Sequence, residues 1–87
     1  MKYTDGQEIK IGDKLTLWDD YIGIVVADID AVEYSSLYPK EDWEYLNTGV
    51  LIVSEHAGLI HYSEPEISFK LLERSQHNRD QQKEGGL

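Results

Sequence analysis

The sequence predicts a mainly β fold: a small, strongly bent, five-stranded antiparallel barrel with one short helix in its longest connection. Three observations support this prediction. The chain has 87 residues, 40% of them apolar, which is enough for one small core but not for two. Its apolar segments are short, rich in β-branched residues and separated by turn residues. An open sheet of this size would also leave long edges exposed, which favours a sheet that bends toward closure.

The first two strands are predicted from their apolar patterns. Apolar and polar residues alternate along residues 8–17, which is the two-residue period of a half-buried strand. Gly12 and Asp13 interrupt this alternation and indicate a turn or bulge. Residues 22–29 are rich in β-branched side chains, so we expect a central strand there. Gly23 within that strand indicates a bulge or a sharp bend.

A short helix is expected after a variable excursion over residues 30–37, where the strand pattern ends. Pro39 suits the first helical turn, and the acidic residues that follow it suit the positive end of a helix. We predict about two turns, with Trp43 and Leu46 facing the core. The sequence Asn-Thr-Gly at 47–49 is typical of a helix end.

The remaining folded segments predict a hairpin and an edge strand. Residues 50–53 and 59–62 are strand-like and lie on either side of an Ala-Gly turn, so we expect them to pair. Residues 69–72 can add a fifth strand at an edge. Residues 1–74 therefore form one domain. Residues 75–87 contain one apolar residue and predict a disordered polar tail, whose deletion should change neither the melting temperature nor binding.

The segment IKIGDKLTLWDDYIGIVV, residues 9–26, resembles the opening hairpin of SH3-like barrels. It contains an apolar pair, a Gly-Asp turn, an alternating strand, a loop and then a second strand that begins near a glycine. This resemblance covers about a quarter of the chain. It implies an SH3-like arrangement for the predicted barrel.

The acidity of the chain is concentrated in one segment. The sequence has 17 acidic and 8 basic residues, a net charge of −9. Residues 19–44 alone contain eight acidic residues and a single lysine, with tyrosine and tryptophan interleaved among them. Such a charge run is often only a solvated face. Because Tyr and Trp are enriched at interfaces, this one also fits a surface for a basic partner.

Composition excludes several classes of protein. The absence of cysteine removes disulfides, thiolate metal sites and cysteine nucleophiles. No apolar run approaches the roughly 18 residues of a membrane span, and no secretory signal is visible, so we expect a cytoplasmic protein without membrane contact. The basic residues do not cluster, which argues against nucleic acid as a direct partner.

The candidate chemical groups do not predict an enzyme. His56 and His61 flank a predicted turn, which could suggest a zinc site, but His61 is better explained as an ordinary strand histidine. Asp28 and Asp30 would share one face of a strand and would need a cleft to act as a hydrolytic pair. The sequence also lacks a phosphate-binding glycine loop and an EF-hand pattern. We therefore expect no catalysis, no metal and no cofactor.

A longer stretch of the sequence resembles a family of small bacterial proteins. The motifs are YSSLYPKEDW at 34–43, then Tyr45-Leu46 and GVLI at 49–52, then AGLIHY at 57–62. Many members of this family look like companions of polymorphic toxins, including effectors of type VI secretion. The resemblance runs from about residue 5 to residue 74. It implies an immunity protein that binds and neutralises the effector of its own cell.

The acidic aromatic segment is the predicted contact surface for such a toxin. A toxin cleft that handles nucleic acid or nucleotides is often basic, and an acidic surface accelerates encounter with it. We expect three aromatic anchors and five complementary charges: Tyr34, Tyr38 and Trp43, with Asp28, Asp30, Glu33, Glu41 and Asp42. Trp43 and Tyr38 are also candidates for simple core packing.

Three other functions remain open at the level of sequence. The first is an SH3-like adaptor that docks a peptide or a subunit of a larger assembly. The second is mimicry of nucleic acid, which needs carboxylates spaced like phosphates. The third is catalysis. An immunity protein should form a tight one-to-one complex, whereas an adaptor groove usually binds peptides weakly.

Overall fold

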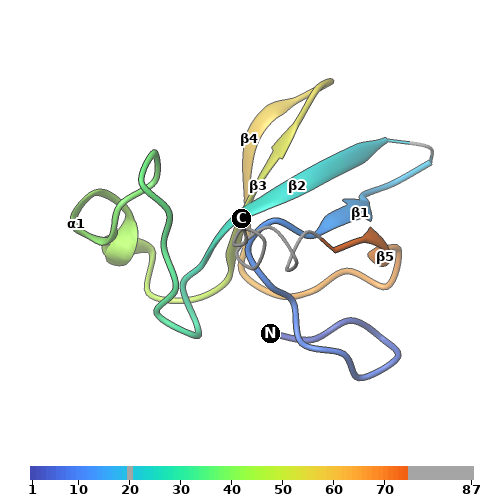
Figure 1. Ribbon diagram of the computed structural model, residues 1–87, viewed down its shortest axis with the longest axis horizontal. Helices are drawn as coiled ribbons and strands as arrows, with labels where there is room; N and C mark the ends of the chain where they lie inside the picture. The colour runs from blue at the N-terminus through green and yellow to red at the C-terminus, as the bar shows by residue number, and fades with distance from the viewer. Residues whose placement is uncertain (20, 75–87) are drawn as a thin grey trace, which may run out of the picture.

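A computed structural model describes residues 1–19 and 21–74 of the chain (Figure 1). The polar tail predicted at 75–87 lies outside the described residues. The described elements follow the predicted order, with five strands and one short helical segment. The strands are β1 (Lys14–Thr16), β2 (Ile22–Asp28), β3 (Val50–Ser54), β4 (Gly58–Tyr62) and β5 (Lys70–Glu73), and the helical turns are α1 (Lys40–Trp43) and η1 (Glu44–Leu46).

All five strands form one antiparallel sheet in the order β4-β3-β2-β1-β5. The first four strands follow one another as a meander, and β5 returns to pair with β1. The expected central strand is confirmed, because β2 occupies the middle of the sheet. The outermost strands β4 and β5 do not pair with each other within the described residues. The fold is therefore mainly β with one antiparallel sheet, as predicted. Within the described residues, hydrogen bonds do not close this sheet into a barrel.

The irregularity of β2 lies at a different residue from the predicted one. Gly23 pairs regularly with Ser54, and the register shifts between Val25 and Ala27 instead. Gly23 serves close packing, because a Cβ atom there would lie 2.4 Å from a methyl carbon of Ile52. The expectation of a bulge at Gly23 was thus wrong. The glycine is instead needed because a side chain at this position would collide with Ile52.

Apolar side chains form two clusters on opposite faces of β3. The main cluster contains Val50 and Ile52 of β3, together with Leu15, Leu17 and Phe69 among others. Leu51 points to the other face and packs with Ala27 and Ile29 in a second cluster. This second cluster is covered by the helical segment, whose Trp43 and Leu46 contact it as predicted. Strand β3 is therefore buried on both faces, as its unbroken apolar sequence indicates.

The helical segment begins and ends where the sequence predicted. Pro39 precedes α1, and Glu41 and Asp42 lie in its first turn. After η1, the backbone adopts positive φ angles of 70° at Asn47 and 99° at Gly49, which stop the helix. None of the described helices is long and apolar enough to span a membrane.

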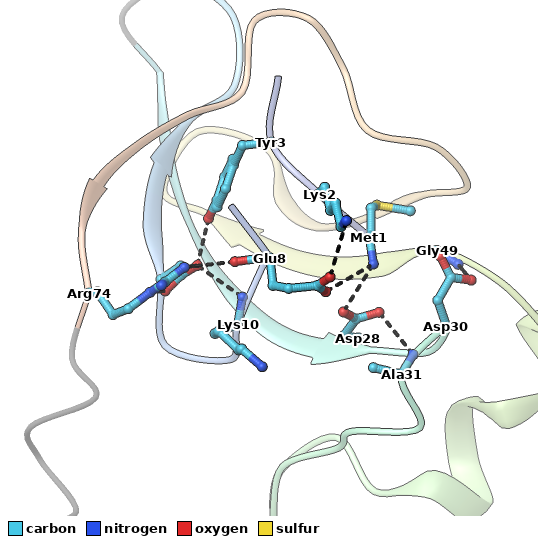
Figure 2. Close-up of polar contacts among 11 residues, drawn as sticks. Met1, Lys2, Tyr3, Glu8, Lys10, Asp28, Asp30, Ala31, Gly49 and Arg74 are labelled. Atoms are coloured by element: carbon cyan, nitrogen blue, oxygen red, sulfur yellow. Dashed lines mark hydrogen bonds and ion pairs between the residues drawn. The ribbon is translucent and has the colours of Figure 1, made fainter. Parts of the chain in front are cut away.

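A buried polar cluster links the N-terminal residues to Arg74, which follows β5 (Figure 2). The Asp13 carboxylate is fully buried. It accepts hydrogen bonds from the Tyr3 hydroxyl at 2.7 Å, from the Lys10 backbone N–H at 2.9 Å, and from Arg74 Nε and Nη2 at 2.8 and 2.9 Å. Arg74 also donates to the Glu8 carbonyl at 2.7 Å. This cluster fixes the N-terminal segment and the end of β5 against the Gly12-Asp13 turn.

A candidate protein-binding surface

The candidate site is the acidic excursion, which we define as residues 29–49 between β2 and β3. In Figure 1 this green segment, which includes α1, projects to one side of the sheet. Its two ends are held together by backbone pairing, because the Ile29 N–H donates to the Gly49 carbonyl at 2.8 Å. The Gly49 N–H in turn donates to the Asp30 carboxylate at 3.0 Å. These hydrogen bonds hold the two ends of the excursion next to each other beside the sheet.

Asp28, a predicted contact residue, lies inside the protein. Its exposed fraction is 0%, and its Oδ1 accepts the Ala31 N–H at 3.3 Å, which shapes the turn at the base of the excursion (Figure 2). Its Oδ2 lies 3.7 Å from the amino group of Met1 and has no hydrogen-bond partner among the described residues. Burial raises the pKa of Asp28, while the amino group of Met1 opposes that shift. A side chain so enclosed offers no charge to a partner, so Asp28 leaves the predicted contact set.

Asp30 and Glu33 also help to form the base of the excursion. The predicted common face of Asp28 and Asp30 is wrong, because β2 ends at Asp28 and Asp30 lies in the following turn, exposed. Glu33 is half-buried, and its backbone pairs with that of Asp28 in both directions, at 2.8 and 2.9 Å. Asp30 keeps a solvent-facing carboxylate, but one of its oxygens already accepts the Gly49 N–H.

The three predicted aromatic anchors share one environment. Tyr34, Tyr38 and Trp43 are partly buried and pack against the second apolar cluster. The Tyr38 and Trp43 rings lie 6.1 Å apart, and the Trp43 and Tyr45 rings lie 6.4 Å apart in a stacked arrangement. Tyr45 is 69% exposed, which makes it the most accessible aromatic ring of this group. Trp43 therefore makes the core contact that was one of its two predicted roles, and it is only partly buried there.

Apart from Asp30, the exposed charges of the excursion lie along its helical turns. Glu41, Asp42 and Glu44 are all exposed, and Lys40 is the one basic residue of the excursion. Within residues 1–19 and 21–74, no ion pair involves any of these acids. Their charges are thus not neutralised by the described part of the protein. Glu44 and Tyr45 belong to the same exposed surface. The sequence could have indicated both, because they lie in the same run of acidic and aromatic residues as the predicted contact residues.

An apolar groove lies between the excursion and the sheet. It has a volume of about 270 Å³ and lies between β2, the turn at Gly12 and the loop 35–38. Ile24 and Leu37 are among its lining residues, and Leu37 is 83% exposed at the tip of the loop. The serine hydroxyl of Ser35 donates to the Val26 carbonyl at 2.7 Å and holds this loop over the sheet. Sequence analysis missed the groove, because nothing local predicts that the loop folds back over β2.

Val32 has an unusual conformation within the same excursion. Its φ angle is 57°, a left-handed value that β-branched residues rarely adopt, and its side chain is 60% exposed. Strain of this kind costs of order 1–3 kcal/mol and is found most often at functional sites. The excursion therefore exposes a valine that its backbone conformation disfavours.

The histidines take structural contacts in the described part of the molecule. His56 stacks on Tyr21 with ring centroids 4.1 Å apart. The Nε2 atom of His61 lies 2.7 Å from the Thr48 carbonyl oxygen. No group of three or more potential metal ligands occurs within the residues that the structure describes.

The site and fold together define a small antiparallel β protein whose longest connection forms an acidic, aromatic surface. Compared with known protein families, curated proteins and solved structures, the chain shows no significant match in any of the three.

Proposed function

We propose that this chain is a binding protein of the immunity type, which neutralises a bacterial toxin effector by covering it with the acidic excursion. One observation supports the proposal most directly: exposed carboxylates without ion-pair partners in the described chain lie beside aromatic side chains that are only partly buried against the second apolar cluster. Anchored aromatics lose little side-chain entropy on binding, and carboxylates attract a basic partner from a distance. The toxin as partner comes from the sequence resemblance described above.

In this proposal the protein acts by occlusion in the cytoplasm of the cell that makes the toxin. It needs no cofactor and performs no chemistry. The contact residues carried forward are Asp30, Glu33, Tyr34, Tyr38, Glu41, Asp42 and Trp43, with Glu44 and Tyr45 added and Asp28 removed.

The test is protection of cells against the product of the gene encoded next to this one. A toxic neighbour should lose its toxicity when this protein is co-expressed. The double variant Glu41→Lys with Asp42→Lys should reduce the association rate at least about tenfold, because two charges on the contact surface change sign. Both side chains are exposed, so the melting temperature should stay within about 2 °C.

The matched control carries the same charge change elsewhere. Asp5→Lys with Asp19→Lys alters two exposed acids outside the excursion and should slow association much less. Equal slowing by both double variants would reduce the effect to net charge. A neighbour that is not toxic, or a toxic one that binds neither form, would contradict the proposed function.

The apolar groove supports a second candidate, an adaptor that docks a short peptide. Its lining by Ile24 and Leu37 suits one aliphatic side chain rather than an extended charged surface. Leu37→Asp would abolish such binding while leaving toxin neutralisation by Glu41 and Asp42 largely intact. Isothermal titration with the partner, followed by this variant, distinguishes the two functions.

A further inference from the structure

We propose that the free edge of β4 is a second binding site, which accepts an extended, positively charged segment of a partner protein as a sixth strand. The site consists of the backbone of β4, Gly58–Tyr62, and the three glutamates that flank it. It lies on different elements from the acidic excursion and goes beyond the function proposed above.

The backbone of β4 is available on one side. The strand pairs only with β3, and no turn or loop hydrogen bond among the described residues involves the backbone of residues 58–62. In Figure 1 the hairpin of β3 and β4 extends away from the other elements, with β4 on its outer side. Alternate N–H and C=O groups of an edge strand point outward and can pair with another chain.

The two edges of the sheet differ in how they are protected. The edge strand β5 carries Lys70 and Glu73, and its pairing with β1 contains a register irregularity. Charged residues and bulges are devices by which proteins prevent strand addition. The sequence of β4, GLIHY, has no proline and no acidic or basic residue apart from His61, and its pairing with β3 is regular. Only the β5 edge therefore carries these protections.

Both faces of β4 offer apolar contacts to an added strand. On the outer face, Leu59 lies in register with Val53 of β3, which in turn lies in register with Ile24 of β2. Leu59 and Ile24 are 38% and 39% exposed. On the other face, Ile60 and Tyr62 are partly buried against the main cluster. Because cross-strand neighbours stabilise a sheet, aliphatic side chains of an added strand would extend both rows.

The charges around β4 determine which segment fits. Glu55 lies before the strand, Glu64 and Glu66 lie after it, and all three are exposed. Residues 50–69 contain no lysine or arginine. None of the ion pairs within residues 1–19 and 21–74 involves these three glutamates. An extended segment with basic residues at its ends and aliphatic residues in its middle complements this pattern.

A second copy of the chain fits the same edge poorly. If two β4 strands paired antiparallel about Ile60, Glu55 of each copy would fall beside Glu64 and Glu66 of the other. Like charges placed opposite each other destabilise a strand pair. Each copy also carries a net charge of −9, which opposes association. Charge complementarity therefore favours a basic partner over self-pairing.

Amide hydrogen exchange measured by NMR on the full chain tests the proposal. The probe is a short synthetic peptide with lysines at both ends and alternating valine and threonine between them. It should slow exchange at alternate amides of β4 and leave those of β5 unchanged. A control peptide in which proline replaces each valine keeps the charge but cannot pair as a strand, and it should protect no amide of β4.

Two triple variants of equal charge locate the contribution of the glutamates. Glu55→Gln, Glu64→Gln and Glu66→Gln together should weaken binding of the probe about fivefold at low salt. Asp5→Asn, Asp19→Asn and Glu73→Gln together change three exposed acids outside both proposed surfaces and should weaken it less than about twofold. The proposal is wrong if the peptide protects no amide of β4, or if both triple variants weaken binding equally. Protection of β4 that appears without peptide and rises with protein concentration would also overturn it, because the edge would then take a second copy.

Discussion

At Asp13, one buried carboxylate joins three distant parts of the chain. Burial alone would raise the pKa of Asp13, but hydrogen bonds from Arg74, Tyr3 and the Lys10 N–H, together with the guanidinium charge, outweigh burial and lower it below the ordinary value of 3.8. The same cluster acts on its other members. Burial and the bond to Asp13 raise the pKa of Tyr3, and the bond to Asp13 raises that of Arg74. All three groups are therefore held in the protonation states in which they pair.

The pH dependence of stability follows from the lowered pKa of Asp13. Because the folded-state pKa lies below 3.8, the ionised carboxylate stabilises the fold above that pH, and the contribution is lost as the pH falls through the folded-state pKa. Asp13→Asn should lower the free energy of unfolding at pH 7 by about 2 kcal/mol. In urea denaturation at several pH values, the gap between the two proteins should narrow below pH 3.8. A gap that is independent of pH would contradict this assignment.

A second single substitution, at Val32, is expected to raise the stability of the fold rather than lower it. Glycine adopts its left-handed conformation without steric cost, so Val32→Gly should stabilise the fold by about 1 kcal/mol. In a domain of this size that corresponds to a rise of about 5 °C in the melting temperature. Ala31→Gly, in the same turn but without a positive φ angle, is the control and should not stabilise. A melting temperature that falls in Val32→Gly would show that the valine side chain contributes more than its strain costs.

At the scale of elements, the junction between the excursion and β3 depends on Gly49. A Cβ atom there would lie 2.1 Å from the Tyr62 carbonyl oxygen and 2.8 Å from Nε2 of His61. The positive φ angle of Gly49 adds strain to any substitution. The helix end and the first pair of the β3–β4 hairpin are therefore packed against each other with no room for a side chain.

Two alanine substitutions separate this close packing from backbone strain. Gly58 also has a positive φ angle, but nothing lies within 4 Å of a Cβ atom built there. Gly58→Ala should therefore cost only about 1 kcal/mol, the strain of the left-handed conformation. Gly49→Ala should cost at least about 3 kcal/mol, because neighbouring backbone must also move. Equal losses in chemical denaturation would mean that the hairpin adapts to the added methyl group.

For the whole molecule, the net charge of −9 opposes the compact state. Sodium chloride screens this repulsion, while the buried Asp13–Arg74 pair is screened much less. Raising the salt concentration from about 10 mM to 500 mM should increase stability by roughly 0.7 kcal/mol, or about 4 °C in melting temperature. The double variant Glu41→Lys with Asp42→Lys changes the net charge by four, from −9 to −5, and should show a smaller rise. An equal rise in both proteins would point to a general salt effect.

Local patterns were enough to predict most elements of this fold. The β-branched run at 22–29 became the central strand, and residues 50–53 and 59–62 paired as a hairpin. The helix follows Pro39 and ends at Asn47 with a positive φ angle. Each of these signals depends on residues that are close in sequence, where backbone preference and hydrophobic period act directly.

The candidate site was predicted less completely, because charge does not reveal which side of a strand is buried. The register shift between Val25 and Ala27 places Ala27 in the second cluster, and Asp28 is then enclosed near the amino group of Met1. A regular strand pattern cannot show that change of side. By contrast, predicting the helix was enough to predict that Glu41 and Asp42 are exposed.

The sequence by itself determined the class of fold, the order of the strands along the chain, the helix after Pro39 and the acidic aromatic character of residues 29–49. These properties depend on local backbone preference and on composition. Only the tertiary structure decided that Asp28 is buried, that Asp13 is paired with Arg74 across 61 positions of the chain, and that β4 is an outer strand of the sheet formed by the described residues. Each of these depends on contacts between segments far apart in sequence, whose geometry is set by how the whole sheet packs.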